Sequence, residues 1–385
     1  MTYITSVKRL GVIMRPEPGE LTEAWGVLNP AAARGRDGAL YLFARVVAEG
    51  NISRIRMARV VFNGEGVPTG VKRMRFALEP REPYEGGGDG SLGGCEDPRI
   101  TYIAALDRYV MAYTACGPSG AHVALAISTD LFAWERLGVV EFGEQDGIDF
   151  DCFEDKDAVI FPEPVVAPDG TAALACMHRP MTGLDQDLLR CPELVDLPAS
   201  IWVSYVPLAK ARRDVRSLTR MRQHRLVARP TNEWEQIKMG GGAPPVLTSH
   251  GWLLLYHGVE DHGRDGQLEL LRYSTGALLI NRHDVRRVIW RSPVPIMVAE
   301  TEDEIVGIVN NVVFPTGVDV GPDGHIDVYY GMADTCIGVA RMWLREGLDA
   351  RALPIRPATA HDALLHIPGD DCQCAACVSR REPAV

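Results

Sequence analysis

The sequence lacks the apolar runs and the cysteine spacing that would place it in a membrane or in a disulfide-stapled class. No uninterrupted apolar stretch in its 385 residues approaches the length of roughly 20 residues that a membrane-spanning helix needs. Lys8 and Arg9 interrupt the amino-terminal segment, which therefore has no apolar core of the secretory type. The nine cysteines are odd in number and scattered, unlike a disulfide framework. We expect a cytoplasmic protein with reduced thiols and no membrane partner.

Lysine is also scarce, and positive charge is in deficit. Only 5 of the 40 basic residues are lysine, and the net charge is −11. This balance disfavours binding of nucleic acid or anionic membranes over the whole surface. An anionic substrate would need a local basic pocket. The chain also has no Walker loop, dinucleotide-binding fingerprint or nucleophile elbow.

What the sequence does have is an internal repeat of one hairpin pattern. Each copy carries a proline-containing turn, an apolar strand, a polar turn such as Asp-Gly, and a second strand. The copies are Asn29–Val46, Cys95–Ala115, Lys156–Pro180, Gly240–Val259 and Asn310–Asp334. Two further strands fit in each interval, which predicts an all-β, five-bladed β-propeller in a single domain. We assign residues 1–350 to this domain and residues 351–385 to a carboxyl-terminal tail, with a short helix or loop over Leu208–Arg216.

Polar side chains end the second strand of every hairpin. Equivalent strands of a propeller lie at equal distances from its axis, so we expect these ends to meet around one opening. The residues are Arg45, Tyr113, His178-Arg179, His257 and Asp334.

The densest motif is Gly93-Gly94-Cys95-Glu96-Asp97-Pro98-Arg99. Pro98 favours an extended Asp97, and the adjacent Arg99 would lower the pKa of that carboxyl group. Apolar burial or substrate contact would raise the pKa towards the range of a general acid. The alternative is an Asp-Pro turn with a surface ion pair.

A second theme is basic. His178-Arg179, Lys238 and His257 could bind phosphate, with Arg45, Arg54 and Arg56 adding to the cluster. The glycines that follow Lys238, at 240–242, would let a ligand approach the backbone. The alternative is that several of these arginines are solvated surface residues.

Several motifs together resemble glycoside hydrolase family 130. They are Glu96-Asp97-Pro98-Arg99-Ile100, Lys156-Asp157-Ala158-Val159-Ile160-Phe161-Pro162-Glu163, Met177-His178-Arg179-Pro180, Gly242-Ala243-Pro244-Pro245 with Tyr256-His257-Gly258, and Tyr329-Tyr330-Gly331 with Ala333-Asp334. The resemblance covers roughly residues 20–345 and implies a five-bladed propeller that is an inverting β-mannoside phosphorylase or, in a smaller set, a hydrolase of β-1,2-mannosides. It implies that Asp97 is the general acid. It further implies phosphate binding by Arg45, Arg179, Lys238 and His257, and sugar contacts by Asn29 and Asp334; we add Glu96 and Arg99 to the substrate-binding set.

These residues predict phosphorolysis of a β-mannoside or mannooligosaccharide to α-mannose 1-phosphate and a shortened acceptor. An inverting hydrolase needs a carboxylate base to activate water, whereas phosphate arrives as an anion and needs cations around it. Inorganic phosphate is then a co-substrate, and no metal or organic cofactor is expected. Whether the chain forms a homo-oligomer is left open.

Two alternatives to this function remain. One is a β-mannosidase of the same fold with a base among Asp151, Glu154 and Asp155, and the other is a non-catalytic carbohydrate-binding propeller.

The tail raises a separate question, because Cys372, Cys374 and Cys377 could bind zinc together with His361 or His366. We expect a flexible tail with free thiols instead.

Overall fold

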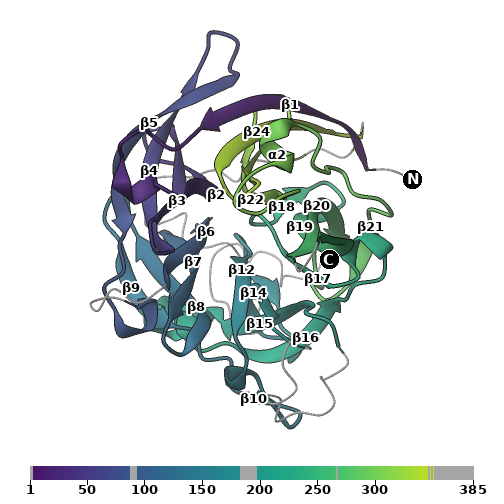
Figure 1. Cartoon of the computed structure of the whole chain (residues 1–385). Coiled ribbons are helices and arrows are strands. Elements are labelled where there is room, and N and C mark those ends of the chain that lie inside the picture. The colour runs from purple at the N-terminus through teal and green to yellow at the C-terminus, as the bar shows by residue number, and fades with distance from the viewer. Residues whose placement is uncertain are drawn as a thin grey trace, which may run out of the picture.

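Antiparallel sheets make up almost all of the structure. The computed structural model describes residues 3–86, 93–182, 197–265, 268–345, 347 and 350. Its strands fall into successive four-stranded groups, and Figure 1 shows these groups following one another around a central region. The chain is therefore a mostly-β single domain, as the repeat predicted.

The first two groups are joined in one sheet. The first contains β2 (Gly26–Arg34), β3 (Leu40–Ala48), β4 (Ile52–Phe62) and β5 (Pro68–Leu78). The second contains β6 (Gly93–Ile103), β7 (Arg108–Gly117), β8 (Gly120–Ser128) and β9 (Glu135–Val139). A short parallel pairing of β4 with β6 links them through Ile52–Gly93 and Ser53–Gly94.

The third and fourth groups each carry one extra short strand. The third contains β12 (Asp155–Ile160), β14 (Ala172–Pro180), β15 (Ile201–Pro207) and β16 (Arg222–Ala228), with β13 (Val165–Val166) paired to β14. The fourth contains β17 (Lys238–Gly241), β19 (Gly251–Asp265), β20 (Leu268–Ile280) and β21 (Val288–Arg291), with β18 (Val246–Thr248) paired to β19. Between the second and third groups lies a small hairpin, β10 (Glu144–Gln145) and β11 (Ile148–Asp149).

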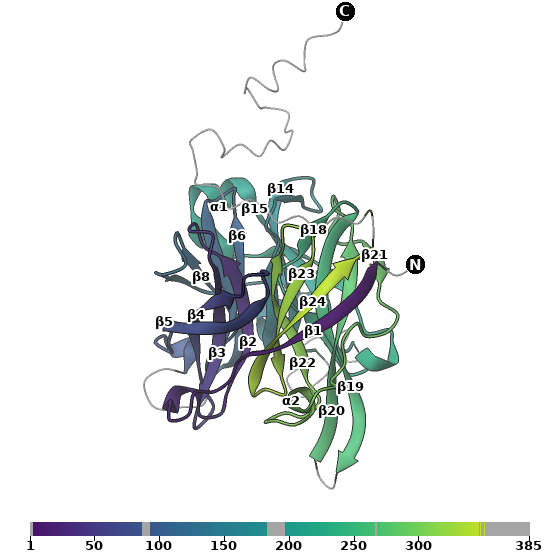
Figure 2. The ribbon, with the colours of Figure 1, turned by 90° about the horizontal axis from the view of Figure 1, so that it is seen from above.

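The last group joins the two ends of the described chain. It contains β22 (Val313–Val320), β23 (Ile326–Met332), β24 (Cys336–Leu344) and β1 (Ile4–Met14). The first strand pairs antiparallel with the last, from Ile4–Leu344 to Met14–Ile337, and the two run side by side in Figure 2. This pairing joins the first strand of the described chain to the sheet formed by its last three strands.

All five predicted hairpins are present. They are the pairs β2–β3, β6–β7, β12–β14, β17–β19 and β22–β23. Gly38, Gly170 and Gly324, the second residues of the Asp-Gly turns, have φ values of 77°, 85° and 83°, which glycine adopts without steric cost. The short helix or loop predicted over Leu208–Arg216 begins with the α-helix α1 (Leu208–Arg213), and another α-helix of the described residues, α2 (Glu302–Ile305), precedes β22.

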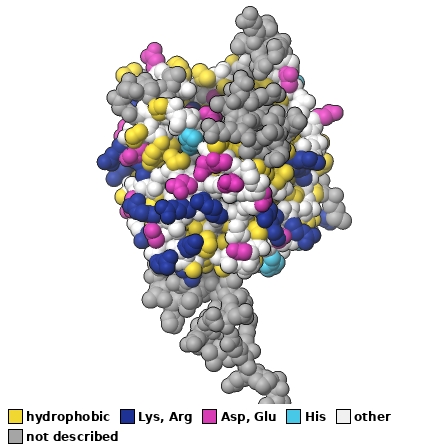
Figure 3. All heavy atoms as spheres, turned by 90° about the horizontal axis from the view of Figure 1, so that it is seen from below, with side chains coloured by type: hydrophobic (Ala, Val, Ile, Leu, Met, Phe, Trp, Pro, Cys, Tyr) yellow, Lys and Arg dark blue, Asp and Glu magenta, His cyan; other side chains and the backbone are white. Residues whose placement is uncertain are grey.

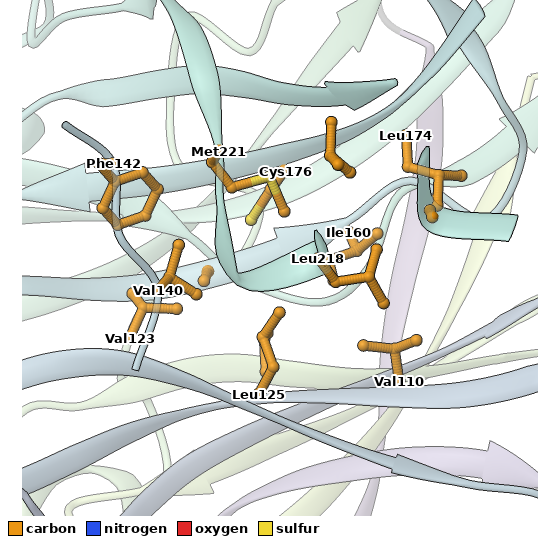
Figure 4. Close-up of a cluster of buried hydrophobic side chains, with 14 of the residues drawn as sticks. Val110, Val123, Leu125, Val140, Phe142, Ile160, Leu174, Cys176, Leu218 and Met221 are labelled. Carbon is orange, nitrogen blue, oxygen red and sulfur yellow. The ribbon is translucent and has the colours of Figure 1, made fainter. Parts of the chain in front are cut away.

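The core lies between neighbouring sheets. Figure 4 shows one such cluster, in which Val110 and Leu125 of the second group face Ile160 and Leu174 of the third. The buried cysteines behave as small apolar residues here, and all five described cysteines are free thiols. Among the described residues, no helix has the length and apolar character to cross a membrane.

Candidate active site

A cavity of about 200 Å³ receives side chains from every four-stranded group. Seven of the nine predicted site residues line it: Asn29, Arg45, Asp97, Arg179, Lys238, His257 and Asp334. The other lining residues are Lys156, Asp157, Met181, Tyr273, Val309, Val312 and Phe314. The ends of different hairpins therefore meet at one opening.

The strands deliver these side chains through left-handed backbone at the cavity. Asn29, Asp97, Asp157 and Asp334 have φ values of 42°, 44°, 58° and 51°. The strand register shifts beside the first three of them, at bulges in β2, β6 and β12. Asn and Asp tolerate this conformation better than other side chains, and bulges of this kind redirect a residue out of the regular alternation.

The extended conformation expected for Asp97 is therefore wrong. Its φ of 44° is left-handed, although Pro98 follows it. The bulge between Glu96 and Arg99 and the hydrogen bonds to its carboxylate outweigh the local preference that the proline imposes.

Asp97 is held by two donors on one carboxylate oxygen. Asn29 Nδ2 donates to Asp97 Oδ1 at 2.9 Å, and Arg45 Nη1 donates to the same atom at 3.1 Å. Burial raises the pKa of Asp97, but Arg45, Arg99 and the hydrogen bond from Asn29 together outweigh burial and hold this pKa below its usual range. Without substrate, the carboxyl group is thus ionised at neutral pH.

Asp334 lines the same cavity as Asp97, but its pKa is shifted in the opposite direction. Burial, together with the charges of Asp97 and Glu96, outweighs the effect of Arg45 and raises the pKa of Asp334 to about 6. Two carboxylates near one arginine cannot both be compensated fully, so their pKa values move apart.

The basic wall of the cavity is organised by Asp157. Its Oδ1 accepts a hydrogen bond from Arg99 Nη2 at 2.8 Å, and its Oδ2 accepts one from Arg179 Nε at 2.5 Å. These guanidinium groups outweigh the effect of burial and hold the pKa of Asp157 well below its usual range. The Nε edge of Arg179 is thereby fixed, while the residue still lines the cavity.

Arg179 is also anchored through its backbone. Asp155 Oδ1 accepts a hydrogen bond from the Arg179 amide at 3.0 Å, and Asp155 Oδ2 lies 2.5 Å from His178 Nδ1. The first and third residues of β12 thus hold the main chain and the side chain of one arginine.

Lys238 and His257 complete this wall. Burial and, to a smaller extent, the nearby Arg179 outweigh the attraction of Asp157 and together lower the pKa of Lys238 to about 8. Burial likewise lowers the pKa of His257 to about 3, so its imidazole is neutral. His257 lines the cavity, and its Nδ1 is buried without a hydrogen-bond partner among the described residues, while its Nε2 lies 3.6 Å from Asp157 Oδ2.

The glycines after Lys238 include one that packs closely against side chains of the site. A Cβ atom on Gly240 would lie 2.3 Å from Asp157 Oδ2 and 2.6 Å from His257 Cε1. Gly240 therefore leaves room for these two side chains, and the approach of a ligand to the backbone at 240–242 stays a prediction.

Comparison with known proteins identifies the family. The family model described as beta-1,4-mannooligosaccharide phosphorylase matches residues 7–351. The chain belongs to glycoside hydrolase family 130. It is therefore a member of the β-mannoside phosphorylases, as the motifs indicated.

Two relatives of this chain are named as phosphorylases of β-1,2-linked mannosides. The chain is 33% identical to a 1,2-beta-oligomannan phosphorylase of Thermoanaerobacter sp. (strain X514), over 66% of this chain and 70% of that protein. It is 30% identical to a Beta-1,2-mannobiose phosphorylase of Listeria innocua, over 66% of this chain and 59% of that protein.

The fold of the family 130 chain also matches solved structures. A structure of the Listeria innocua beta-1,2-mannobiose phosphorylase, in complex with beta-1,2-mannobiose, superposes with a TM-score of 0.65 at 23% identity. It covers 88% of this chain and 97% of that one.

Two of the predicted site residues support the cavity without lining it. Glu96 Oε1 accepts a hydrogen bond from Arg45 Nη2 at 2.8 Å. Arg99 is 2% exposed and donates to the carbonyl oxygens of Gly241 and Gly242, at 3.0 and 2.7 Å. Arg99 therefore joins β6 to the fourth group instead of reaching the cavity.

Several residues of the wider prediction lie elsewhere. Tyr113 is buried and donates to Glu85 Oε1 at 2.7 Å, so one of the five strand ends does not reach the opening. Arg54 lies 3.6 Å from Glu79, and Arg56 packs over the Phe76 ring at 4.4 Å; neither lines the cavity.

The carboxylates considered for a hydrolytic base are also engaged outside the cavity. Asp151 accepts hydrogen bonds from the amides of Phe142 and Gly143 at 2.6 and 3.0 Å. Glu154 accepts one from the Ala121 amide at 3.1 Å, and Asp155 holds Arg179 as described.

The main residues that sequence reasoning left without a role are Lys156, Asp157 and Tyr273. Asp157 follows the start of the third repeat, at the place that Asn29 and Asp97 occupy in the first two. A residue-by-residue alignment of the repeats would have singled it out. Tyr273 has no counterpart of this kind; its ring lies 5.5 Å from Lys238 Nζ.

Among the described residues, no group of three or more His, Cys, Asp or Glu side chains could hold a metal ion. The cysteine cluster of the tail, at Cys372, Cys374 and Cys377, lies outside the described residues. On the face of the molecule seen in Figure 3, basic and acidic side chains lie side by side. Arg216 and Glu135, for example, form an exposed pair at 2.8 Å.

Proposed function

We propose that this protein cleaves a β-mannoside with inorganic phosphate, with inversion, to give α-mannose 1-phosphate and a shortened acceptor. The observation that carries this proposal is that Asp97 faces the same cavity of about 200 Å³ as Arg179, Lys238 and His257. An acid and a cationic anion-binding wall in one small cavity are what phosphorolysis requires. The proposal includes a five-bladed β-propeller as the architecture, with residues 1–350 as the catalytic domain and residues 351–385 as a tail.

Phosphate would bind on the Arg179–Lys238–His257 wall. With its Nε held by Asp157 and its Nη1 donating to Met181 Sδ, Arg179 can present its Nη2 group to an anion, and lysine adds a compact positive charge. The neutral His257 would contribute a hydrogen bond through a ring nitrogen. Arg45 lies next to Asp97, so we propose that it contacts phosphate or sugar at the boundary of the two subsites.

The mannose would bind between Asn29, Asp97 and Asp334. Asp97 donates its proton to the glycosidic oxygen, directly or through a mannose hydroxyl, as the bond from that oxygen to the anomeric carbon breaks. A phosphate oxygen attacks this carbon from the opposite face. Hydrogen phosphate gives up its own proton as it becomes the ester, so the proton that Asp97 donates can be replaced.

The ionised state of Asp97 in the empty cavity must change when substrates bind. Phosphate brings negative charge into the cavity and offsets the positive charges of Arg45 and Arg99, which lower the pKa of Asp97 in the empty cavity. The sugar displaces water from the carboxyl group. Both effects raise the pKa of the carboxyl group towards the range of a general acid.

The linkage is proposed from the relatives. The two named above are β-1,2-mannoside phosphorylases, so β-1,2-mannobiose and longer β-1,2-mannooligosaccharides are the first substrates to test. The description of the family model makes β-1,4-mannooligosaccharides the second.

The deciding experiment is to incubate the protein with each oligosaccharide, with and without phosphate. We expect mannose 1-phosphate only when phosphate is present. Free mannose released equally without phosphate would replace the proposal with hydrolysis by a β-mannosidase. Binding of sugar without any turnover would indicate the non-catalytic alternative.

A further inference from the structure

An exposed apolar group lies at the rim of the cavity. Large apolar side chains are rarely exposed in this protein, yet four of the eleven such residues in the described part fall between positions 305 and 309. They are Ile305, Val306, Ile308 and Val309, with exposed fractions of 39%, 63%, 62% and 36%. Trp25, just before β2, is 40% exposed. Together these five residues are called the rim patch. Single exposed apolar residues are normal on a protein surface, whereas a group of them indicates a binding surface.

The rim patch flanks the turn that carries Asp334. The Val309 amide donates to the Ala333 carbonyl oxygen at 3.4 Å, and the Ile308 amide donates to Thr335 Oγ1 at 3.3 Å. On the other side, Gly26 packs so closely that a Cβ atom there would lie 2.7 Å from the Asp334 carbonyl oxygen. Trp25 precedes this glycine. Figure 2 places α2 and the purple turn before β2 at the same end of the molecule.

The patch is continuous with the cavity. Val309 belongs to both, because it lines the cavity together with Asp334 and Val312. A ligand that fills the cavity and extends past Asp334 would therefore reach Ile308 and Val306 next.

The backbone under the patch is fixed. Glu304 closes a capping box with Thr301, and its Oε1 accepts hydrogen bonds from Arg9 Nε and the Tyr330 hydroxyl, both at 2.8 Å. The Asn311 amide donates to the Ile305 carbonyl oxygen at 3.1 Å. The apolar side chains are thus presented by a hydrogen-bonded segment and are not exposed through loose packing.

We propose that the rim patch is the binding surface for the acceptor part of the substrate, the sugar units beyond the bond that is cleaved. This inference rests on the proposed function. A pyranose ring has faces covered by C–H bonds, which pack on indole and aliphatic side chains, while its hydroxyl groups stay in water. Ligand sites commonly combine apolar walls with a few polar groups. The surface suits a β-linked mannooligosaccharide, whose units offer such faces in succession, better than a free monosaccharide.

The test uses the reverse reaction, in which mannose 1-phosphate and an acceptor are the substrates. Trp25→Ala and Ile308→Ser should raise the KM for β-1,2-mannobiose as acceptor by about tenfold and about threefold, because each removes part of the apolar contact. The KM for mannose 1-phosphate should change by less than twofold. Ile289→Ser on β21, a residue 48% exposed and outside the patch, is the matched control and should leave both constants unchanged.

The outcomes separate this inference from the proposed function. If the wild type forms and consumes mannose 1-phosphate while both rim variants keep the wild-type acceptor KM, the inference is wrong and the function stands. If the wild type shows no phosphate-dependent turnover, the function falls, and titration of mannotriose into wild type and Trp25→Ala still tests the patch by the loss of affinity. Light scattering is measured alongside, because a dimer that dissociates in the rim variants would make the patch an interface between copies and overturn the inference.

Discussion

The inner strands carry two different cavities, one near each end. The site cavity receives Asn29 of β2 and Asp97 of β6, whereas a second cavity of about 160 Å³ receives Ala32 and Ile100 farther along the same strands. The second cavity is mainly apolar, with Pro244, Pro245, Val246, Leu247, Val318 and Val320 among its lining residues. The same five-fold repeat thus produces a charged cavity at one end and an apolar one at the other.

The difference lies in how charge is compensated. In the apolar cavity, Arg34 and Asp319 satisfy each other through two hydrogen bonds of 2.8 and 2.6 Å. In the site cavity, Asp157 is shared by two arginines, while Lys238 has a depressed pKa and His257 Nδ1 lacks a partner within the described chain. Function is expected where buried polar groups are incompletely paired, since such groups cost stability unless a ligand completes them.

The largest effect should come from the acid. Asp97→Asn should lower kcat by ~10²–10⁴ with little change in folding, because the amide keeps the shape but cannot donate a proton as an acid. Circular dichroism and turnover of the purified variant check this. Retention of more than about a third of wild-type turnover would show that Asp97 is not the general acid.

The next effect separates phosphate binding from sugar binding. Arg179→Ala should raise the phosphate KM roughly ten- to hundredfold, because hydrogen bonds between charged groups contribute about 1.5–3 kcal/mol. The KM for the mannoside should change much less. Arg179→Lys should recover only part of the loss, since a point charge does not replace the guanidinium fork.

Arg34→Ala is the matched control, because it removes an arginine from the apolar cavity. An unchanged phosphate KM in Arg179→Ala, or an equal increase in Arg34→Ala, would contradict the assignment of the basic wall.

How far the sequence predicts these two cavities can be judged from single residues. The repeat fixes the hairpins and brings Arg45, Arg179, His257 and Asp334 to one opening, since strand position alone determines where a strand ends. Strand position wrongly places Tyr113 at the opening, because its hydroxyl group donates to the buried Glu85, a partner that the local sequence pattern does not reveal. It also fails for Arg99, whose side chain bonds to backbone oxygens of another group, 142 and 143 residues away.

The backbone at the site is the other part that local rules miss. An Asp-Pro pair favours an extended aspartate, yet Asp97 is left-handed because a bulge and two hydrogen bonds determine its conformation. Long-range contacts of this kind are not encoded in any short window of sequence.

A smaller effect concerns pH. Because the pKa of Lys238 is lowered to about 8, this residue loses its charge as the pH rises through that value. The phosphate KM should therefore increase above about pH 8, while bound phosphate favours the protonated form and moves the decline in kcat to higher pH.

Lys238→Arg tests this explanation, because arginine stays charged throughout that range. Its phosphate KM should be flat from pH 7 to about 9.5, whatever its absolute value. A decline identical to that of the wild type would assign the titration to another group.

The smallest effect on catalysis is expected at the apolar end. Asp319→Asn removes one charge from the Arg34–Asp319 ion pair, whose hydrogen bonds are as short as those in the site cavity. It is therefore the counterpart of Asp97→Asn at the other cavity. Both kcat and the phosphate KM should stay within about twofold of wild type, because the Arg34–Asp319 pair meets no reacting group. Arg34 is 37% exposed and can regain water, so the free energy of unfolding should fall by only about 1 kcal/mol, measured by denaturant titration. A large loss of turnover in a variant that remains this stable would mean that the two ends are coupled, and the separation of a charged functional end from an apolar structural one would be wrong.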